Sequence, residues 1–248
     1  MLANHCRIVL CSSDEVQSTF PGDPVQYLSP RERTTWAAIH DAKYRRDWFV
    51  GRMTVKKLYD ALDADSCPLS SKCKRFQQYE IISRNTAGHG IRPELNVHGI
   101  ASRRTISISH AGDMICAGIG LSPRIRFGLD VTPLNAVSPV VVRSFFSESE
   151  QRRIAESPDP HFAERSWCAK EASYKALGRS EAFMPRSFRL ASPGGNFLVC
   201  TYRDRKERSR TFVFSGQCQS VAFAIAVVPE TVSLQTPSEL SRHAGAVP

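Results

Sequence analysis

The spacing of apolar residues predicts a mixture of helices and strands along most of the chain. In residues 43–62 the apolar side chains recur every three or four positions, which indicates a helix with one face in the core. Residues 105–109 alternate between apolar and polar side chains, as a strand does. A turn at 110–113 is expected to lead into a second strand at 114–119, and another short strand is expected at 127–132.

Residues that typically begin or end a helix predict further elements on both sides of residues 105–132. Ser29 followed by Pro30 is typical of a helix start. Helices are expected over 137–177, and Gly178 suits the residue that ends the last of them. The stretch before Leu28 gives few readable elements. Further strands are expected at 188–190, 197–202, 211–214 and 220–228.

A basic or mixed helix followed by strands occurs in each part of the chain. This order favours an α+β fold of two similar halves, residues 1–124 and 125–248, although no strong internal sequence repeat accompanies it. The tail from about residue 231 contains serine and proline and is expected to be loose.

The composition is that of an ordinary globular protein. Hydrophobic residues make up 42% and charged residues 23% of the 248 positions, which excludes a largely disordered chain. The longest unbroken apolar run, Val221–Val228, is far shorter than the ~20 residues of a membrane-spanning helix. The first residues have no basic start and no long apolar stretch, so neither a membrane segment nor a secretory signal is expected.

The eight cysteines form no CxxC pair and no spacing typical of zinc. We therefore expect reduced thiols in a cytoplasmic protein, in preference to a disulfide framework.

Lysine and arginine outnumber aspartate and glutamate by 33 to 24, a net charge of +9. Such a balance suits an anionic partner, whether nucleic acid, an acidic protein or a small polyphosphate. The helix at 43–62 and a glycine-containing loop expected at 84–93 are both basic and could cradle phosphate, or could be solvated basic surfaces. The run 203–210 is expected to be a solvated hairpin loop.

Two acidic residues and a lysine are candidates for chemistry. Trp167, Glu171 and Lys175 are spaced by four and would line one face of a helix. Asp130 stands inside a strand between apolar neighbours, where an acid is rarely buried without a partner. Together Asp130 and Glu171 would make a two-carboxylate Mg²⁺ site completed by substrate phosphates. The alternatives are a surface Glu–Lys pair and a solvent-facing aspartate.

His110 ends a strand just before a turn, where it could donate to a phosphate or simply stabilise the turn. The chain has no GxxxxGK[ST], GxSxG or GxGxxG motif, so P-loop, α/β-hydrolase and Rossmann functions lose their usual sequence marks.

Taken together, four segments in order resemble the large class of 4′-phosphopantetheinyl transferases, often called the Sfp type. The four segments are 46–52 (RDWFVGR), 107–113 (SISHAGD), 128–132 (GLDVT) and 167–178 (WCAKEASYKALG). A fifth segment, 145–150 (FFSESE), also resembles a motif of this class. The resemblance spans roughly residues 28–188.

The resemblance implies an enzyme that moves the phosphopantetheine arm of coenzyme A onto a serine of an acyl or peptidyl carrier protein. It implies Mg²⁺ as cofactor and adenosine 3′,5′-bisphosphate as the released product. It also implies two halves related by a pseudo-twofold axis, with coenzyme A in the cleft between them, in a monomer that binds neither nucleic acid nor membrane.

The resemblance assigns roles to individual residues. Asp130 and Glu171 would hold Mg²⁺, with Thr132 at a third ligand position. Glu171 would help to deprotonate the carrier serine, and Lys175 would neutralise charge on the leaving phosphate. The remaining candidates would contact coenzyme A: His110 and Ser109 its phosphates, Arg84 and Arg92 adenine or phosphate, and Arg46 and Arg33 the 3′-phosphate.

Three positions depart from the family pattern. Thr132 stands where many members have a second strand acid, which leaves the affinity and choice of metal open. Ser107 replaces an asparagine, and Thr35 occupies a position that is often basic. Thr132 leaves a second reading open, a degenerate member that binds coenzyme A without transfer. The net charge leaves a third, a basic nucleic-acid-binding module. Fatty acid, polyketide and nonribosomal peptide carriers are all possible partners.

Overall fold

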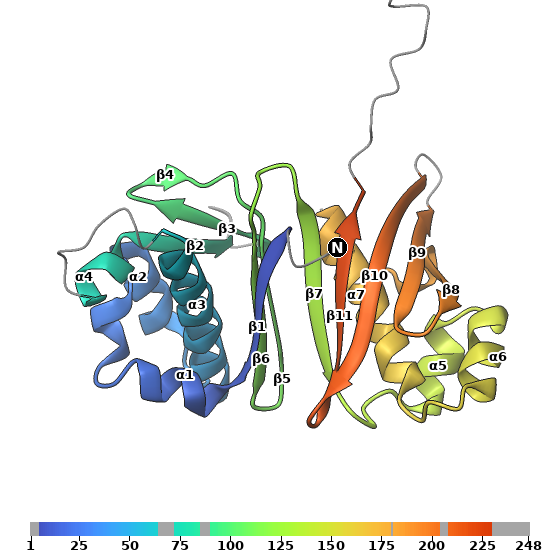
Figure 1. Ribbon diagram of the computed structural model, residues 1–248. Helices are drawn as coiled ribbons and strands as arrows, with labels where there is room; N and C mark the ends of the chain where they lie inside the picture. The colour runs from blue at the N-terminus through green and yellow to red at the C-terminus, as the bar shows by residue number, and fades with distance from the viewer. Residues whose placement is uncertain (1–4, 64–71, 85–89, 180, 204–207, 230–248) are drawn as a thin grey trace, which may run out of the picture.

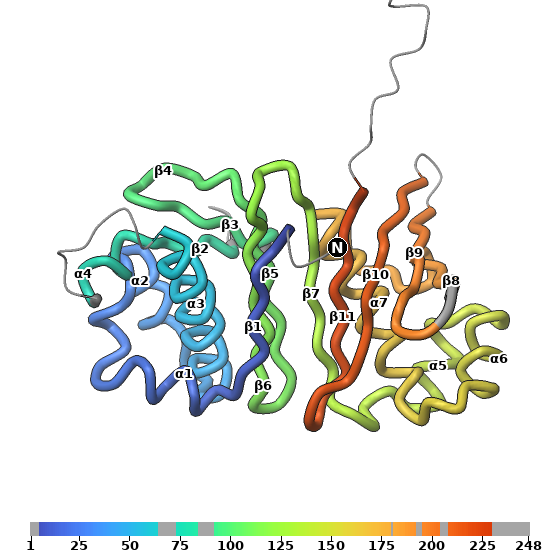
Figure 2. The backbone as a smooth tube through the Cα atoms, viewed as in Figure 1, coloured from blue at the N-terminus to red at the C-terminus, as the bar shows by residue number. Residues whose placement is uncertain are grey.

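The computed structural model describes residues 5–63, 72–84, 90–179, 181–203 and 208–229 of the chain. These residues form two lobes side by side, each with a long helix packed on a sheet (Figure 1). The backbone trace shows the lobes meeting along β5 and β7 (Figure 2). The fold is α+β, as the hydrophobic pattern predicts.

The N-terminal lobe is built around helix α3 (Ala42–Leu62). This helix packs on an antiparallel sheet with the order β1 (Cys6–Ser12), β6 (Met114–Gly120) and β5 (Ile106–Ala111). A second sheet, β2–β3–β4, lies beside it. The other elements are α1 (Ser13–Thr19), the 3₁₀ helix η2 (Pro24–Tyr27), α2 (Pro30–Ala38), α4 (Lys72–Gln77), β2 (Tyr79–Arg84), β3 (Gly90–Val97) and β4 (Ile100–Ala101).

The C-terminal lobe is built around helix α7 (Phe162–Leu177). It packs on one antiparallel sheet with the order β7–β11–β10–β9–β8. Smaller helices cover the end of this lobe near β8 (Figure 1). The elements are β7 (Arg126–Pro133), α5 (Pro139–Phe145), α6 (Glu148–Glu156), the 3₁₀ helix η3 (Pro185–Ser187), β8 (Phe188–Gly194), β9 (Phe197–Arg203), β10 (Arg208–Cys218) and β11 (Val221–Val228).

The two lobes repeat one strand order. In each, the first strand pairs with the last strand, and the last pairs with the one before it: β1–β6–β5 and β7–β11–β10. In the N-terminal lobe β3 packs beside β5 and pairs with β2, which corresponds to β9 and β8 beside β10. The long helix follows the first strand in both lobes. This arrangement is what a duplicated unit would give.

A buried ion pair occurs at the same place in each lobe. Glu32 Oε2 lies 2.5 Å from Lys56 Nζ, and Glu150 Oε2 lies 3.1 Å from Lys170 Nζ. Both lysine side chains are fully buried. Each glutamate also closes a capping box at the start of its own helix. The similarity between the lobes lies in contacts between residues that are distant in the sequence.

Several predicted elements are confirmed. The helix expected at 43–62 is α3, the helix start at Ser29 is a capping box with Pro30 at the first helical position, and Gly178 ends α7 with φ 62°. The strands expected at 105–132 and after 188 are present and mostly longer than predicted. No helix in the described ranges combines the length and hydropathy that crossing a bilayer requires.

Two other expectations were wrong, and two more fall mainly on residues that the structure does not describe. The stretch before Leu28 contains a complete strand and helix, β1 and α1. The basic stretch 84–93 is not one loop, because Gly90–Val97 forms strand β3 and carries Arg92. The centre of the predicted hairpin loop at 203–210 and the predicted loose tail lie outside the described residues, and Arg208 already belongs to β10.

Candidate active site

The candidate site forms because β7 and α7 approach each other unusually closely. Gly128 on β7 faces α7, and a Cβ at this position would lie 2.2 Å from the carbonyl oxygen of Ala172 and 2.5 Å from the amide nitrogen of Ala176. Only glycine allows this contact. The contact places Asp130, two residues further along β7, beside the face of α7 that carries Glu171 and Lys175.

Asp130 is the centre of a polar network that joins three elements. Its side chain is 3% exposed, and its Oδ1 accepts hydrogen bonds from Lys175 Nζ at 2.7 Å and from Ser109 Oγ at 2.8 Å. Lys175 Nζ also lies 3.1 Å from Ser109 Oγ. Ser109 comes from β5 in the N-terminal lobe, Asp130 from β7 and Lys175 from α7. The network therefore spans the junction between the two lobes.

Two serine hydroxyls of β5 fasten this junction. Ser107 Oγ accepts the backbone N–H of Leu129 at 2.9 Å, and Ser109 Oγ accepts that of Val131 at 3.3 Å. Both serines are buried. Because buried backbone donors need partners, these hydroxyls take the place of a strand ladder between β5 and β7. Ser107, a departure from the family pattern, thus has a defined structural partner.

Glu171 completes the cluster. Its carboxyl forms hydrogen bonds with Asp130 and with the indole of Trp167, one turn earlier on α7. Burial and the neighbouring Asp130 carboxylate raise the pKa of Glu171 to about 7, against the opposing effects of Lys175 and Trp167. Because the Asp130 and Glu171 carboxyl groups are adjacent, they would repel each other when both are ionised. A bound cation would relieve this repulsion.

The donor set fits a hard divalent cation. Asp130 and Glu171 supply carboxylate oxygens, and the Thr132 hydroxyl lies 3.4 Å from Asp130 Oδ2. Within the described ranges no group of three or more His, Cys, Asp or Glu residues could hold a metal ion. Mg²⁺ typically takes one or two carboxylates and completes its octahedron with water and phosphate oxygens. The Thr132 departure therefore leaves a site with two carboxylates, which suits that mode of binding.

His110 lies at the end of β5, next to Ser109. It is exposed, yet the protein atoms around the ring remove enough water to lower its pKa, although the nearby Asp47 carboxylate acts in the opposite direction. Arg46 on α3 donates to Asp113, just after β5, with Arg46 Nη2 2.7 Å from Asp113 Oδ1. Arg46 and Asp113 thus link α3 to the turn that follows His110.

The other predicted arginines lie in different surroundings. Arg92 Nη2 donates to the carbonyl of Phe127 at 2.8 Å, and burial together with Arg126 lowers the pKa of Arg92 to about 10. Arg33 Nε donates to the carbonyl of Leu28, within its own helix start. Arg84 is the last residue of β2, and its side chain lies outside the described part. Neither Arg92 nor Arg33 makes a described hydrogen bond to Asp130, Ser109 or Lys175.

The basic helix is not a uniformly solvated face. Lys56 is fully buried against Glu32, and Arg52 is buried with its guanidinium 3.6 Å from the ring centre of Trp48. Arg52 Nη2 also donates to Ser83 Oγ at 2.7 Å. Arg52 and Lys56 therefore belong to the core of the N-terminal lobe and are not available to phosphate.

Sequence reasoning missed one neighbour of the cluster. Cys168 is fully buried on α7, and its Sγ donates to the carbonyl oxygen of Ala222 at 3.5 Å. Burial and the nearby Asp130 carboxylate hold its pKa well above the usual value. It was expected only to be a reduced thiol, and nothing in the local sequence points to Asp130. Three surface hollows lined by described residues, two beside α3 and one beside α5 and α6, contain none of Asp130, Glu171 and Lys175.

One known protein family matches part of the chain. Residues 126–227 match the profile described as the 4′-phosphopantetheinyl transferase superfamily. The matched segment runs from β7 through α7 into β11 and contains Asp130, Glu171 and Lys175. No curated protein is significantly similar to the chain. The segment 126–227 is thus similar to the 4′-phosphopantetheinyl transferase superfamily, a group of transferases.

Proposed function

We propose that this protein is an Sfp-type enzyme that transfers the 4′-phosphopantetheine arm of coenzyme A to a serine of an acyl or peptidyl carrier protein, with Mg²⁺ and with release of adenosine 3′,5′-bisphosphate. The observation that carries the proposal is the meeting of Ser109, Asp130 and Lys175 from three elements of both lobes, with Glu171 beside them. A single chain that holds both lobes supports the Sfp type. The monomeric state and a cytoplasmic location stay predictions.

Glu171 is suited to act as the general base. In the metal-free site burial and the Asp130 carboxylate raise the pKa of Glu171 to about 7; a bound cation would lower it and keep Glu171 ionised, the form in which it accepts a proton. In this role Glu171 takes the proton of the carrier serine hydroxyl as that oxygen attacks the diphosphate phosphorus of coenzyme A that bears the pantetheine arm. Trp167 orients the carboxylate through its indole N–H.

Asp130 and Glu171 would hold the metal, with Thr132 beside them. Mg²⁺ bound there would supply neutralising charge to the diphosphate of coenzyme A. Phosphoryl transfer depends on positioning and on neutralised charge more than on covalent chemistry, so the residues around the diphosphate carry much of the catalysis.

Lys175 acts on the leaving group. Its ammonium is oriented by two short contacts, to Asp130 and to Ser109, and its side chain is 29% exposed, which leaves it open to a ligand. In the proposed reaction Lys175 donates to the phosphate oxygens as the bond to the departing adenosine 3′,5′-bisphosphate breaks. His110 and Arg46 lie on the N-terminal side of the junction and are suited to contact the phosphates of coenzyme A, with Arg46 exchanging Asp113 for phosphate.

Calorimetric titration of coenzyme A, with and without Mg²⁺, tests the substrate and the metal together. We expect binding that tightens when Mg²⁺ is present and that weakens in Asp130→Asn. Binding without turnover on any carrier would support the degenerate reading. Absence of coenzyme A binding, together with salt-dependent binding to DNA or RNA that Glu171→Gln leaves unchanged, would overturn the proposal.

A further inference from the structure

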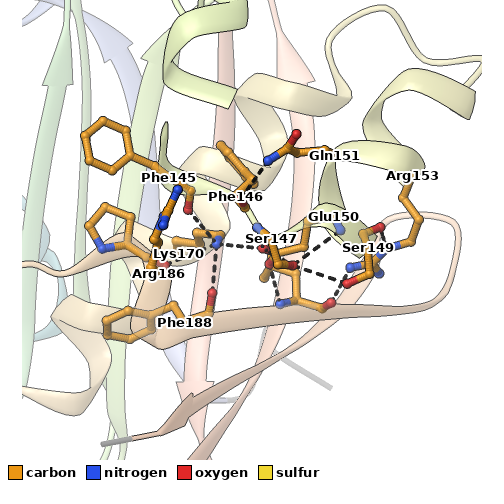
Figure 3. Close-up of polar contacts among 12 residues, drawn as sticks. Phe145, Phe146, Ser147, Ser149, Glu150, Gln151, Arg153, Lys170, Arg186 and Phe188 are labelled. Atoms are coloured by element: carbon orange, nitrogen blue, oxygen red, sulfur yellow. Dashed lines mark hydrogen bonds and ion pairs between the residues drawn. The ribbon is translucent and has the colours of Figure 1, made fainter. Parts of the chain in front are cut away.

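A buried lysine next to Glu171 points away from the candidate site and ties four elements together. Lys170 Nζ donates to Glu150 Oε2 at 3.1 Å and to the carbonyls of Phe188 at 2.8 Å, Pro185 at 3.1 Å and Phe145 at 3.4 Å (Figure 3). These partners belong to α6, β8, η3 and the end of α5. One ammonium on α7 therefore fixes the whole group of elements at the outer end of the lobe.

Glu150 extends the same network. Its Oε1 accepts the backbone N–H of Leu190 at 2.8 Å, and its Oε2 accepts the backbone N–H and the hydroxyl of Ser147, each at 2.8 Å. The Glu150 side chain is 3% exposed. A carboxylate and an ammonium this deeply buried are held in one arrangement, because losing either partner leaves an uncompensated charge.

The network supports the aromatic rings of Phe145, Phe146 and Phe183, which form a wall around Trp167. Phe145, which supplies a carbonyl to Lys170, has its ring centre 5.8 Å from that of Trp167, and the ring of Phe146 lies at 6.2 Å. The ring of Phe183, in the segment between α7 and η3, lies 5.8 Å away. Trp167 in turn donates to Glu171. A continuous chain of contacts thus runs from the buried ion pair, through Phe145 and Trp167, to the Glu171 carboxylate.

The N-terminal lobe contains an equivalent buried ion pair that has no candidate catalytic residue next to it. Lys56 Nζ donates to Glu32 Oε2 and to the carbonyls of Tyr27 at 3.1 Å and Phe76 at 3.0 Å, and Glu32 Oε1 accepts the N–H of Ile81 at 3.0 Å. The residue after this lysine is an exposed lysine, whereas the residue after Lys170 is Glu171. The chain therefore offers an internal control for what the ion pair does as structure alone.

We propose that Glu150 and Lys170 are positioning residues of the transfer reaction: their ion pair fixes the wall that orients Trp167 and, through Trp167, the Glu171 carboxylate. The equivalent pair Glu32–Lys56 only stabilises its lobe. This inference rests on the proposed function, because it concerns the same site.

The test compares Glu150→Gln with Glu32→Gln, two substitutions that keep shape and remove one buried charge in matched surroundings. Turnover is measured at a temperature well below both unfolding midpoints. We expect Glu150→Gln to lower kcat for carrier modification at least about tenfold with little change in the Kd for coenzyme A, because small misplacements of a catalytic group have large effects on rate. Glu32→Gln should keep kcat within about twofold of the wild type.

A second readout does not depend on activity. In protein labelled with 5-fluorotryptophan, the ¹⁹F resonance of Trp167, assigned with Trp167→Phe, should shift or broaden in Glu150→Gln and stay unchanged in Glu32→Gln. If Glu150→Gln does not fold, Phe145→Leu, at a partly exposed position, replaces it and should reduce kcat and perturb the same resonance. Equal effects of the two matched variants on kcat and on the Trp167 resonance, or no effect of Glu150→Gln, would overturn the inference. Inactive wild type with an altered Trp167 resonance would contradict the proposed function alone.

Discussion

At the scale of single residues, the site depends on how Lys175 is held. Its ammonium contacts both Asp130 and Ser109, so it is oriented before any ligand arrives. We expect Lys175→Met to lower kcat by about 100-fold, the usual effect of removing one preorganised donor to developing charge. Lys57→Met, an exposed lysine on the long helix of the other lobe, is the control and should change kcat little. Steady-state kinetics of carrier modification measures both, and equal losses would contradict the role of Lys175.

The raised pKa of Glu171 gives a pH dependence with a definite sign. In the metal-free protein the Glu171 carboxyl is largely protonated below about pH 7 and ionised above it. Because a proton competes with the metal for this carboxylate, metal affinity should rise with pH and level off above the pKa of Glu171. Between about pH 6 and about pH 8 we expect roughly a tenfold gain, which follows from the ionised fraction alone.

Loss of the free Mn²⁺ signal in electron paramagnetic resonance measures this affinity directly, since Mn²⁺ accepts the same oxygen ligands as Mg²⁺. Glu171→Gln should bind more weakly and lose most of the pH dependence. An affinity that is independent of pH in the wild type would mean that Glu171 does not bind the metal.

At the scale of elements, the close packing of β7 on α7 brings the acids together. Gly128→Ala would place a Cβ 2.2 Å from the Ala172 carbonyl oxygen, so β7 and α7 must separate. We expect a loss of about 1–3 kcal/mol in the free energy of unfolding, as for other overpacked sites, and a loss of transfer activity. Thermal and denaturant unfolding, with parallel activity measurements, checks both.

Gly120→Ala is the matched control for this substitution. A Cβ at Gly120, also at a strand position, would meet its nearest atom at 3.5 Å, an ordinary contact. Stability and activity should therefore stay near those of the wild type. If Gly128→Ala behaved like Gly120→Ala, the close approach would not be what builds the site.

Local signals explain which elements the sequence predicts well. The capping serine at Ser29, the left-handed Gly178 and the regular spacing in α3 each act within a few residues, so each can be read directly. Strand β1 was missed because what defines it is its pairing with β6, more than 100 positions further along the chain. Arg92 was placed in a loop because glycine and histidine surround it, whereas pairing with β2 makes it part of a strand.

Some features of the candidate site could likewise be predicted from local sequence, and others could not. The spacing of Glu171 and Lys175 and the setting of Asp130 point to an acid cluster, and the structure brings all three together with Ser109. The burial of Lys56 could not be predicted, because its partner Glu32 lies 24 positions away on another helix. The role of Gly128 likewise depends on a helix that begins more than 30 residues later.

At the scale of the whole molecule, net charge and the junction between the lobes matter most. The chain carries a formal charge of +9, which would attract an acidic carrier protein. Opposite charges accelerate encounter, and salt screens this effect. We expect kcat/KM for the carrier to fall by about tenfold between roughly 0.05 M and 0.3 M salt, while kcat at saturating carrier changes little. Kinetics that are insensitive to salt would show that charge does not guide the encounter.

The central claim is that Glu171 and Asp130, at the junction of the lobes, carry transfer of the phosphopantetheine arm. Intact-mass spectrometry of apo carrier proteins, incubated with this enzyme, coenzyme A and Mg²⁺, tests it most directly. The carrier should gain the mass of one phosphopantetheine arm with the wild-type enzyme, and should gain none with Glu171→Gln or Asp130→Asn, each of which should keep the wild-type circular dichroism spectrum. Full modification by either variant, or no modification by the wild type of fatty acid, polyketide and peptide carriers, would contradict the account.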